Sequence, residues 1–243
     1  MSAAWPYPRW IAHRGAGRLA PENTLAAFAR GHEYGYRMFE CDVRLSADGK
    51  AFLLHDDRLE RTTDGAGEAL EHTWAELARL DAGAWHSLRY AGEPLPLLTE
   101  VLGFCMRHGC ALNIELKPAP GDAERTGAVV AAEVAHHWHC VPAPLLTSFD
   151  PVALAAAAEV APSLPRGLLL ERFADGWRET AARLGCVAIV AEQQAWSPAT
   201  ALAARAAGLR RLAYTVNDDA EAARLLALGL DGLITDRVDH FRP

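Results

Sequence analysis

Short hydrophobic runs alternate with amphipathic or alanine-rich segments along most of the chain. The runs have the length of buried strands, and the segments between them have the spacing of helices. We expect strands at residues 9–13, 38–45, 51–55, 111–116, 144–148, 166–170, 187–191, 211–216 and 232–235. We expect helices at residues 22–34, 98–108, 122–138, 150–160, 175–184, 197–207 and 218–228. Alternation of this kind predicts a parallel sheet covered by helices.

The strand–helix units favour an α/β fold that closes into a TIM (β/α)8 barrel, with residues 51–55 as an extra strand or the edge of an insertion. Single barrels of this type often have about the length of this chain, 243 residues. A doubly wound sheet is the alternative, but no glycine-rich phosphate loop follows the first strand. Residues 56–97 interrupt the alternation around a predicted short helix near 73–80. We expect them to form a small insertion beside the barrel mouth, within one domain over residues 1–243.

Titratable residues stand at the ends of several predicted strands, where apolar residues would be expected. His13 and His55 each close a hydrophobic run, and Glu40 and Asp42 alternate on the run between them. Burying charge is costly unless it is paired or binds a metal. Barrel enzymes build their active sites at the carboxyl ends of the strands. The positions of these residues therefore predict an active site.

The alternation of side chains along a strand places the carboxylates in a common direction. Glu40 and Asp42 should point the same way, about 7 Å apart, and Glu115 and Lys117 should share a face of a later strand. Three carboxylates at one barrel mouth form an oxygen-rich site suited to Mg²⁺ or Ca²⁺. Zinc is less suited, because no cysteine or histidine pair has ligand spacing. A pair of salt-bridged surface carboxylates would explain Glu40 and Asp42 alone.

The histidines and their cationic neighbours indicate proton transfer on an anionic substrate. Histidine exchanges protons near neutral pH, so His13 and His55 could act as acid and base. Either one alone could instead be a core histidine bonded to a carbonyl group. Arg14 follows His13, and Lys117 is one of two lysines in the chain. With a divalent cation these charges suit a phosphoryl group, although Lys117 could simply pair with a carboxylate.

Composition and charge narrow the class of protein. The net charge of −7 gives no sign of a general nucleic-acid surface. The five cysteines are odd in number and contain no CxxC, which is typical of reduced, cytoplasmic thiols. The start of the chain lacks the pattern of a signal peptide, and no run approaches the ~18 apolar residues of a membrane span. We expect a cytoplasmic protein without stable membrane association, and its oligomeric state is left open.

Several motifs, in their order and spacing, resemble those of the glycerophosphodiester phosphodiesterase family. They are HRG at 13–15, PENT at 21–24, ECD at 40–42, LLHDD at 53–57 and NIELK at 113–117. The likeness continues through TSFD at 147–150, AYTVND at 213–218 and DGLITDRVD at 231–239, so it spans nearly the whole chain. It is strongest to the bacterial cytoplasmic branch of the family.

The resemblance implies a TIM barrel that hydrolyses small-molecule glycerophosphodiesters to sn-glycerol 3-phosphate and an alcohol. It implies His13 and His55 as acid–base residues. It also implies one divalent cation, Mg²⁺ or Ca²⁺, held by Glu40, Asp42 and Glu115. The substrate and its phosphate would meet Arg14, Lys117 and Tyr214. Tyr214 stands where many members of the family have a tryptophan.

Two other functions remain open at this point. A phospholipase-type barrel shares the arrangement of two histidines around a pair of carboxylates, but it needs an apolar surface for membrane contact. The insertion offers only Trp74, Trp85 and Leu88 for that purpose. A non-catalytic phosphodiester-binding barrel would usually lack one histidine or one metal carboxylate, and here all are present.

Overall fold

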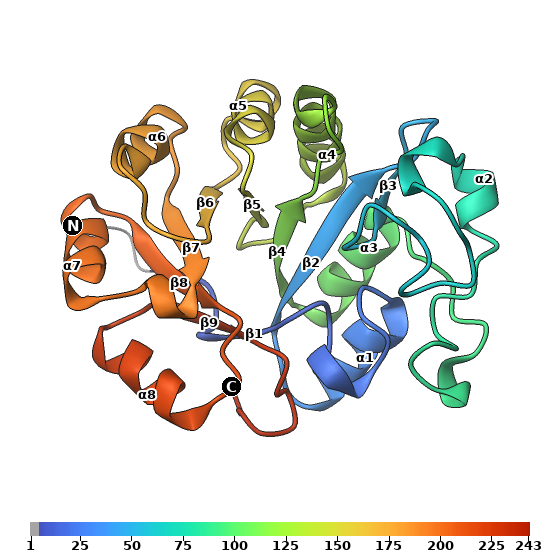
Figure 1. Ribbon diagram of the computed structural model, residues 1–243, viewed down its shortest axis with the longest axis horizontal. Coiled ribbons are helices and arrows are strands. Elements are labelled where there is room, and N and C mark those ends of the chain that lie inside the picture. The colour runs from blue at the N-terminus through green and yellow to red at the C-terminus, as the bar shows by residue number, and fades with distance from the viewer. Residues whose placement is uncertain (1–4) are drawn as a thin grey trace.

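The computed structural model describes residues 5–243, whose strands form one closed sheet (Figure 1). The strands are β1 (Trp10–Ala12), β2 (Met38–Leu45), β3 (Ala51–Leu53), β4 (Ala111–Leu116), β5 (Leu145–Ser148), β6 (Arg166–Leu170), β7 (Ala188–Glu192), β8 (Arg210–Tyr214) and β9 (Gly232–Thr235). The sheet closes because β1 pairs in parallel with both β2 and β9. β3 runs antiparallel along the outer edge of β2. The prediction of a TIM barrel with one additional strand is therefore confirmed.

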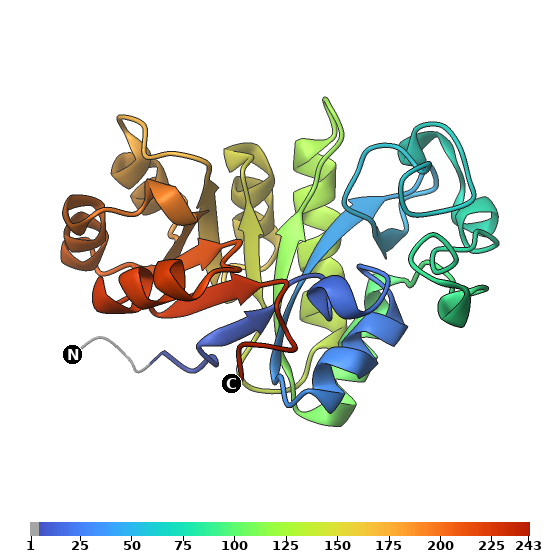
Figure 2. The same ribbon diagram turned by 60° about the horizontal axis from the view of Figure 1, so that its bottom comes forward.

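A ring of helices surrounds the barrel (Figures 1 and 2). These helices are α1 (Leu25–Glu33), α3 (Leu98–His108), α4 (Ala123–His137), α5 (Pro151–Val160), α6 (Trp177–Arg183), α7 (Pro198–Ala206) and α8 (Asp219–Ala227). Side-chain caps begin several of them: Thr24 accepts a hydrogen bond from an amide of α1, and Asp218 accepts two from amides of α8. Gly109 ends α3 in the left-handed conformation, at a φ of 63°.

Strand alternation divides the core into two layers. From β2, Phe39 and Cys41 pack outward among the helices, whereas Met38 points into the barrel. The floor of the barrel is apolar and is formed by Ile11, Met38, Ala111, Leu145, Leu169, Ala188, Val190, Leu212 and Ile234. The next inward positions of β2 after Met38 are Glu40 and Asp42. The barrel thus has an apolar floor beneath a polar mouth.

The insertion between β3 and α3 lies beside the barrel mouth, at the right of Figures 1 and 2. It contains one short helix, α2 (Trp74–Leu77), within the predicted range 73–80. Short 3-10 turns complete the structure at Gly17–Leu19, Ala69–Glu71, Leu88–Tyr90 and Gln193–Ala195. The insertion packs a small core of its own, including Leu59 and Leu77, against Phe52 of β3. It is therefore fixed to the barrel beside the site.

Two expectations from the sequence concern the chain's relation to membranes. Within residues 5–243, no helix combines the length and the apolar character needed to cross a bilayer. The expected lack of a signal peptide concerns the start of the chain, where residues 1–4 lie outside the described residues.

Candidate active site

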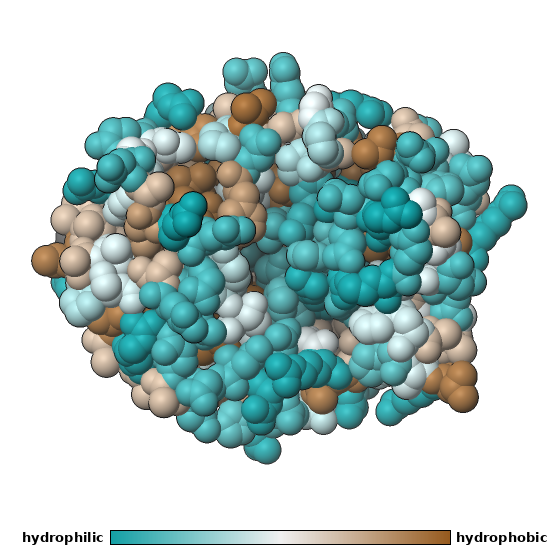
Figure 3. Space-filling model, viewed as in Figure 1, coloured by the Kyte–Doolittle hydropathy of each residue, from teal (hydrophilic) through white to brown (hydrophobic). Residues whose placement is uncertain are grey.

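A cavity of about 680 Å³ opens at the carboxyl ends of the strands. Figure 3 shows it as a hollow at the centre of this face, bordered mainly by hydrophilic side chains. The cavity is lined by seven of the eight predicted site residues: His13, Arg14, Glu40, His55, Glu115, Lys117 and Tyr214. The eighth, Asp42, is only 1% exposed and forms ion pairs with the lining residues Arg14 and Lys117. The structure therefore brings the whole predicted set to one place.

The three predicted carboxylates converge from two adjacent strands. Asp42 of β2 is the register partner of Glu115 of β4, and Glu40 lies two residues before Asp42 on the same face. A carboxylate oxygen from each lies within 4.8 Å of the others. Burial and the charge of Asp42 raise the pKa of Glu40 to about 8, and the same two causes raise the pKa of Glu115. Ionisation of all three carboxyl groups is therefore unfavourable in this cluster, and a divalent cation would stabilise it.

Asp42 is the member of this cluster that stays ionised. Burial acts to raise its pKa, but Arg14 and Lys117 outweigh burial and lower it to about 2. The amide of Asn23 donates a hydrogen bond to Asp42 Oδ2 at 2.8 Å, and the Asp42 backbone N–H donates to Asn23 Oδ1 at 3.2 Å. Sequence reasoning missed Asn23, because its motif, PENT, has a sufficient local explanation as the start of a helix.

His13, which follows β1 directly, is held by groups from the other end of the chain. Its Nδ1 lies 2.6 Å from Asp236 Oδ1, and its Nε2 lies 3.8 Å from Glu40 Oε2. Asn217 donates a hydrogen bond to the second oxygen of Asp236 at 2.8 Å. Burial acts to lower the pKa of His13, but the two carboxylates outweigh it and raise the pKa. Asp236 and Asn217 were not predicted as site residues, although both lie in motifs that carry the resemblance.

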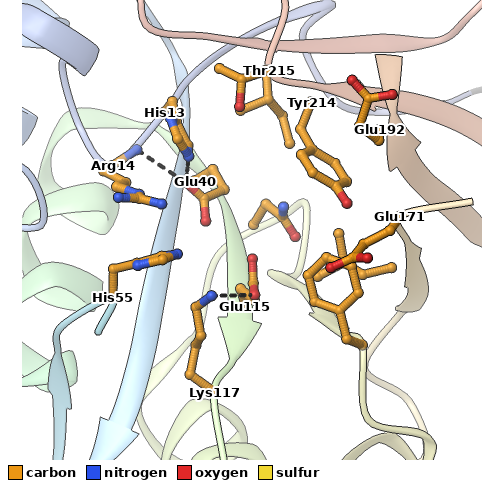
Figure 4. A pocket seen from close by; sticks show the side chains of 14 residues that line it. His13, Arg14, Glu40, His55, Glu115, Lys117, Glu171, Glu192, Tyr214 and Thr215 are labelled. Atoms are coloured by element: carbon orange, nitrogen blue, oxygen red, sulfur yellow. Dashed lines mark hydrogen bonds and ion pairs between the residues drawn. The ribbon is translucent and has the colours of Figure 1, made fainter. Parts of the chain in front are cut away.

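His55 lies two residues beyond β3, on the side of the cavity that also holds Arg14 and Lys117 (Figure 4). Its Nδ1 lies 2.6 Å from Asp56 Oδ1. Burial lowers the pKa of His55, and the charges of Arg14 and Lys117 act in the same direction. The two histidines thus have environments that move their pKa values apart.

Arg14 and Lys117 both contact the carboxylate cluster. Arg14 has a positive φ of 49°, and its backbone N–H donates to Glu40 Oε2 at 3.0 Å. Its buried Nε lies 3.1 Å from Asp42 Oδ2 as an ion pair, without a hydrogen bond. Lys117 Nζ lies 3.0 Å from Glu115 Oε1 and 3.6 Å from Asp42 Oδ1. Lys117 therefore pairs with carboxylates and also lines the cavity.

Tyr214 ends β8 and stands across the cavity from His55 (Figure 4). Its hydroxyl donates a hydrogen bond to the Leu170 carbonyl at 3.1 Å, and its ring lies 6.0 Å from that of Phe149 in an edge-to-face contact. Burial raises the pKa of Tyr214. The hydroxyl is thus already bonded to the protein, and the ring forms an apolar wall of the cavity.

Comparison with known proteins identifies the family of the chain. Residues 13–240 match the model of the glycerophosphoryl diester phosphodiesterase family. The chain belongs to this family. It is 31% identical over 231 residues to the glycerophosphodiester phosphodiesterase of Caldanaerobacter subterraneus, with 93% of each chain covered. It is 33% identical over 247 residues to a putative glycerophosphodiester phosphodiesterase of Bacillus subtilis, with 94% of each covered.

Solved structures of similar proteins agree with this assignment. An Oleispira antarctica phosphodiesterase in complex with the product sn-glycerol 3-phosphate is 37% identical, with a TM-score of 0.91 over 95% of this chain and 93% of that one. Glycerophosphodiester phosphodiesterase from Agrobacterium tumefaciens is 31% identical, with a TM-score of 0.81 over 95% and 97% of the two chains. The predictions of the family and of a phosphodiesterase enzyme are confirmed.

Proposed function

We propose that this phosphodiesterase hydrolyses glycerophosphodiesters to sn-glycerol 3-phosphate and an alcohol, with one divalent cation bound by Glu40, Asp42 and Glu115. The observation that carries the proposal is the convergence of these three carboxylates beside two histidines, in the cavity of a family member. The product bound by the Oleispira antarctica relative supports the same product here.

The three carboxylates fit a hard cation by their chemistry. Each offers an oxygen ligand, and oxygen ligands of this kind suit Mg²⁺ or Ca²⁺. The raised pKa values of Glu40 and Glu115 support the fit, because burial and the charge of Asp42 disfavour their ionised forms and a bound divalent cation would favour them. When bound, such a cation would stabilise the negative charge on the phosphoryl oxygens.

Arg14 and Lys117 would bind the substrate's phosphate group. Both side chains are 17% exposed and line the cavity beside the carboxylate cluster. The Arg14 guanidinium is held by ion pairs with Asp42 and Glu22, and its positive charge at the cavity wall would attract a phosphate oxygen. The positions of Arg14 and Lys117 would orient the phosphodiester between the two histidines.

The two histidines would divide the proton transfers. The lowered pKa of His55 keeps it neutral near pH 7, so we assign it as the base, with Nδ1 bonded to Asp56 and Nε2 accepting the proton. The raised pKa of His13 favours its protonated form, so we assign it as the acid. His55 removes the proton of the attacking hydroxyl as the new P–O bond forms. The bond to the alcohol breaks, and His13 donates a proton to the departing oxygen.

The attacking hydroxyl could come from water or from the substrate's own glycerol, which would give a cyclic phosphate first. Phosphorus NMR separates the two routes, because the cyclic phosphate has its own resonance. A cyclic species that never appears at early times, even in variants with slow turnover, supports direct attack by water.

Tyr214 would contact the carbon atoms of the substrate. Because its hydroxyl is bonded to Leu170, the ring is the part available for contact. Together with Phe149 it would pack on an apolar part of a small-molecule substrate, in place of the tryptophan that many relatives have.

The insertion gives little support to a lipid substrate. Trp74 packs 5.9 Å from the ring of Phe52 in the insertion's own core, while Trp85 is 42% and Leu88 is 88% exposed. Leu70 of the insertion is also exposed, at 43%, and three such side chains make a small apolar surface. We therefore propose small soluble diesters as substrates, and the cytoplasmic location and the absence of a nucleic-acid partner stay predictions.

An assay with a panel of glycerophosphodiesters tests this function. The substrates are glycerophosphocholine, glycerophosphoethanolamine and glycerophosphoglycerol, each with added Mg²⁺, Ca²⁺ or Mn²⁺. Release of sn-glycerol 3-phosphate from at least one of them is expected. No release from any substrate with any of these cations would contradict the proposal.

A further inference from the structure

Arg61, in the insertion, contacts two carboxylates at the edge of the site. It forms two hydrogen bonds with Glu22: Nη1 to Oε2 at 2.9 Å and Nη2 to Oε1 at 2.7 Å. It forms two more with Asp56: Nε to Oδ2 at 2.5 Å and Nη2 to Oδ1 at 3.0 Å. Forked contacts of this kind fix the orientation of a guanidinium group and a carboxylate relative to each other. One side chain therefore connects the segment before α1 with the segment after β3.

Each of these carboxylates also holds a proposed site residue. Glu22 Oε1 accepts a hydrogen bond from Arg14 Nη1 at 2.7 Å. Asp56 Oδ1 lies 2.6 Å from His55 Nδ1. The paired charges run without a break from Arg14 through Glu22, Arg61 and Asp56 to His55, and both ends lie on the same side of the cavity (Figure 4).

The alternative is that Arg61 forms only surface ion pairs without a role at the site. Exposed ion pairs of that kind contribute little to stability. Arg58 illustrates that case: it is 58% exposed and pairs with Glu60 and Glu68, both on the surface of the insertion. Arg61 is 43% exposed, but its partner Glu22 is only 15% exposed. Unlike the partners of Arg58, the partners of Arg61 contact Arg14 and His55, which line the cavity.

We propose that Arg61 is a positioning residue that holds Asp56 against His55 and Glu22 against Arg14. The inference rests on the proposed function, in which His55 accepts a proton and Arg14 binds the phosphate. Held in this way, Asp56 keeps Nδ1 of His55 as a hydrogen-bond donor and leaves Nε2 free to accept the proton. Loss of Arg61 releases Asp56 to rotate, and the histidine then loses its fixed tautomer.

Steady-state kinetics on a hydrolysed glycerophosphodiester test whether Arg61 acts through Asp56. Arg61→Gln should lower kcat by about 10–100-fold, as is usual when the partner that orients a site residue is lost. In an Asp56→Asn background the same substitution should lower kcat much less, because the route to His55 is already broken. Equal losses of kcat in both backgrounds would overturn the inference. Arg61→Lys keeps the charge without the fork and serves if Arg61→Gln does not fold.

The nitrogen resonances of His55 give a readout that a structural role would not move. We expect the Nδ1–H tautomer in the wild type and a mixture of tautomers in Arg61→Gln, by ¹⁵N NMR of the imidazole ring. Arg58→Gln is the matched control and should leave both kcat and the tautomer unchanged. An unchanged kcat and tautomer in Arg61→Gln, with an active wild type, would overturn the positioning role. A wild type that hydrolyses no diester would instead contradict the proposed function.

Discussion

His13 and Asp236 form a direct pair, with 2.6 Å between Nδ1 and Oδ1, although 223 positions separate them in the chain. They meet because β1 and β9 lie side by side, with Ala12 opposite Thr235. Closure of the barrel therefore places the Asp236 carboxylate beside His13. Burial alone would lower the pKa of His13, and Asp236 and Glu40 reverse that effect.

Replacing Asp236 should impair the acid. Asp236→Asn keeps the shape of the side chain but removes the charge that helps raise the pKa of His13. His13 would then lose its proton at a lower pH, so the alkaline limb of kcat/KM against pH should move to lower pH. We also expect kcat to fall by about 10–100-fold, as for other supporting partners of site residues. An alkaline limb that does not move would contradict the assignment of His13 as the acid.

Replacing His55 should remove the base. His55→Ala is expected to lower kcat by about 10²–10⁴-fold, the usual contribution of a general base. Because its pKa is lowered, His55 stays neutral to lower pH, and the acidic limb of the wild-type profile should lie below about 6.5. His240→Ala is the control, since this exposed histidine pairs with Asp219 away from the cavity. An acidic limb clearly above pH 7 would contradict the assignment.

Cation binding should release a proton from the carboxylate cluster. The pKa of Glu40 is raised to about 8, so without a cation this group is largely protonated at pH 7. A cation needs the ionised carboxylate, so binding at pH 7 should release up to about one proton, and affinity should fall as the pH is lowered. Isothermal titration of Ca²⁺ or Mg²⁺ in two buffers with different ionisation enthalpies measures this release.

Glu171→Gln is the matched control for that titration. Glu171 also lines the cavity, but it lies outside the group of three carboxylates. Its replacement should leave cation affinity unchanged, whereas Glu115→Gln should abolish detectable binding. Equal affinities of the two variants would argue against the proposed ligand set.

Gly17 should tolerate no side chain, because it lies against the loop that carries Asp236. A Cβ atom at Gly17 would lie 2.2 Å from the Asp236 carbonyl oxygen, and φ is 54°, where residues other than glycine are strained. Gly17→Ala should lower the free energy of unfolding by about 1–3 kcal/mol and lower activity by displacing Asp236. Urea unfolding measures the first effect. Gly92→Ala, whose added Cβ would meet no atom within 4 Å, controls for the loss of a positive-φ glycine.

Much of the site follows from strand geometry alone. The side-chain period of two is enough to place Glu40 and Asp42 on one face and Cys41 on the other, and the structure has this arrangement. The position of Glu115 required one further step, that its strand lies next to β2. That step follows once a parallel barrel is predicted, because the carboxyl ends of its strands meet at one mouth.

The supporting residues could not be predicted in the same way. Asp236 contacts His13 only because the barrel closes, and the local sequence around either residue does not indicate that contact. Arg61 and Glu22 meet because an irregular insertion folds back over the segment before α1. Loop conformations of this kind depend on packing and charge pairing rather than on periodicity. The contacts made by irregular segments therefore become visible only in the structure.

Restoration of activity by added cations tests the central claim most directly. The claim is that Glu40, Asp42 and Glu115 hold a cation that hydrolysis requires. Protein treated with EDTA should release no sn-glycerol 3-phosphate from a diester that the untreated protein hydrolyses, and added Mg²⁺ or Ca²⁺ should restore release in the wild type but not in Glu115→Gln. Full activity of the EDTA-treated wild type, or equal restoration in the variant, would contradict the claim.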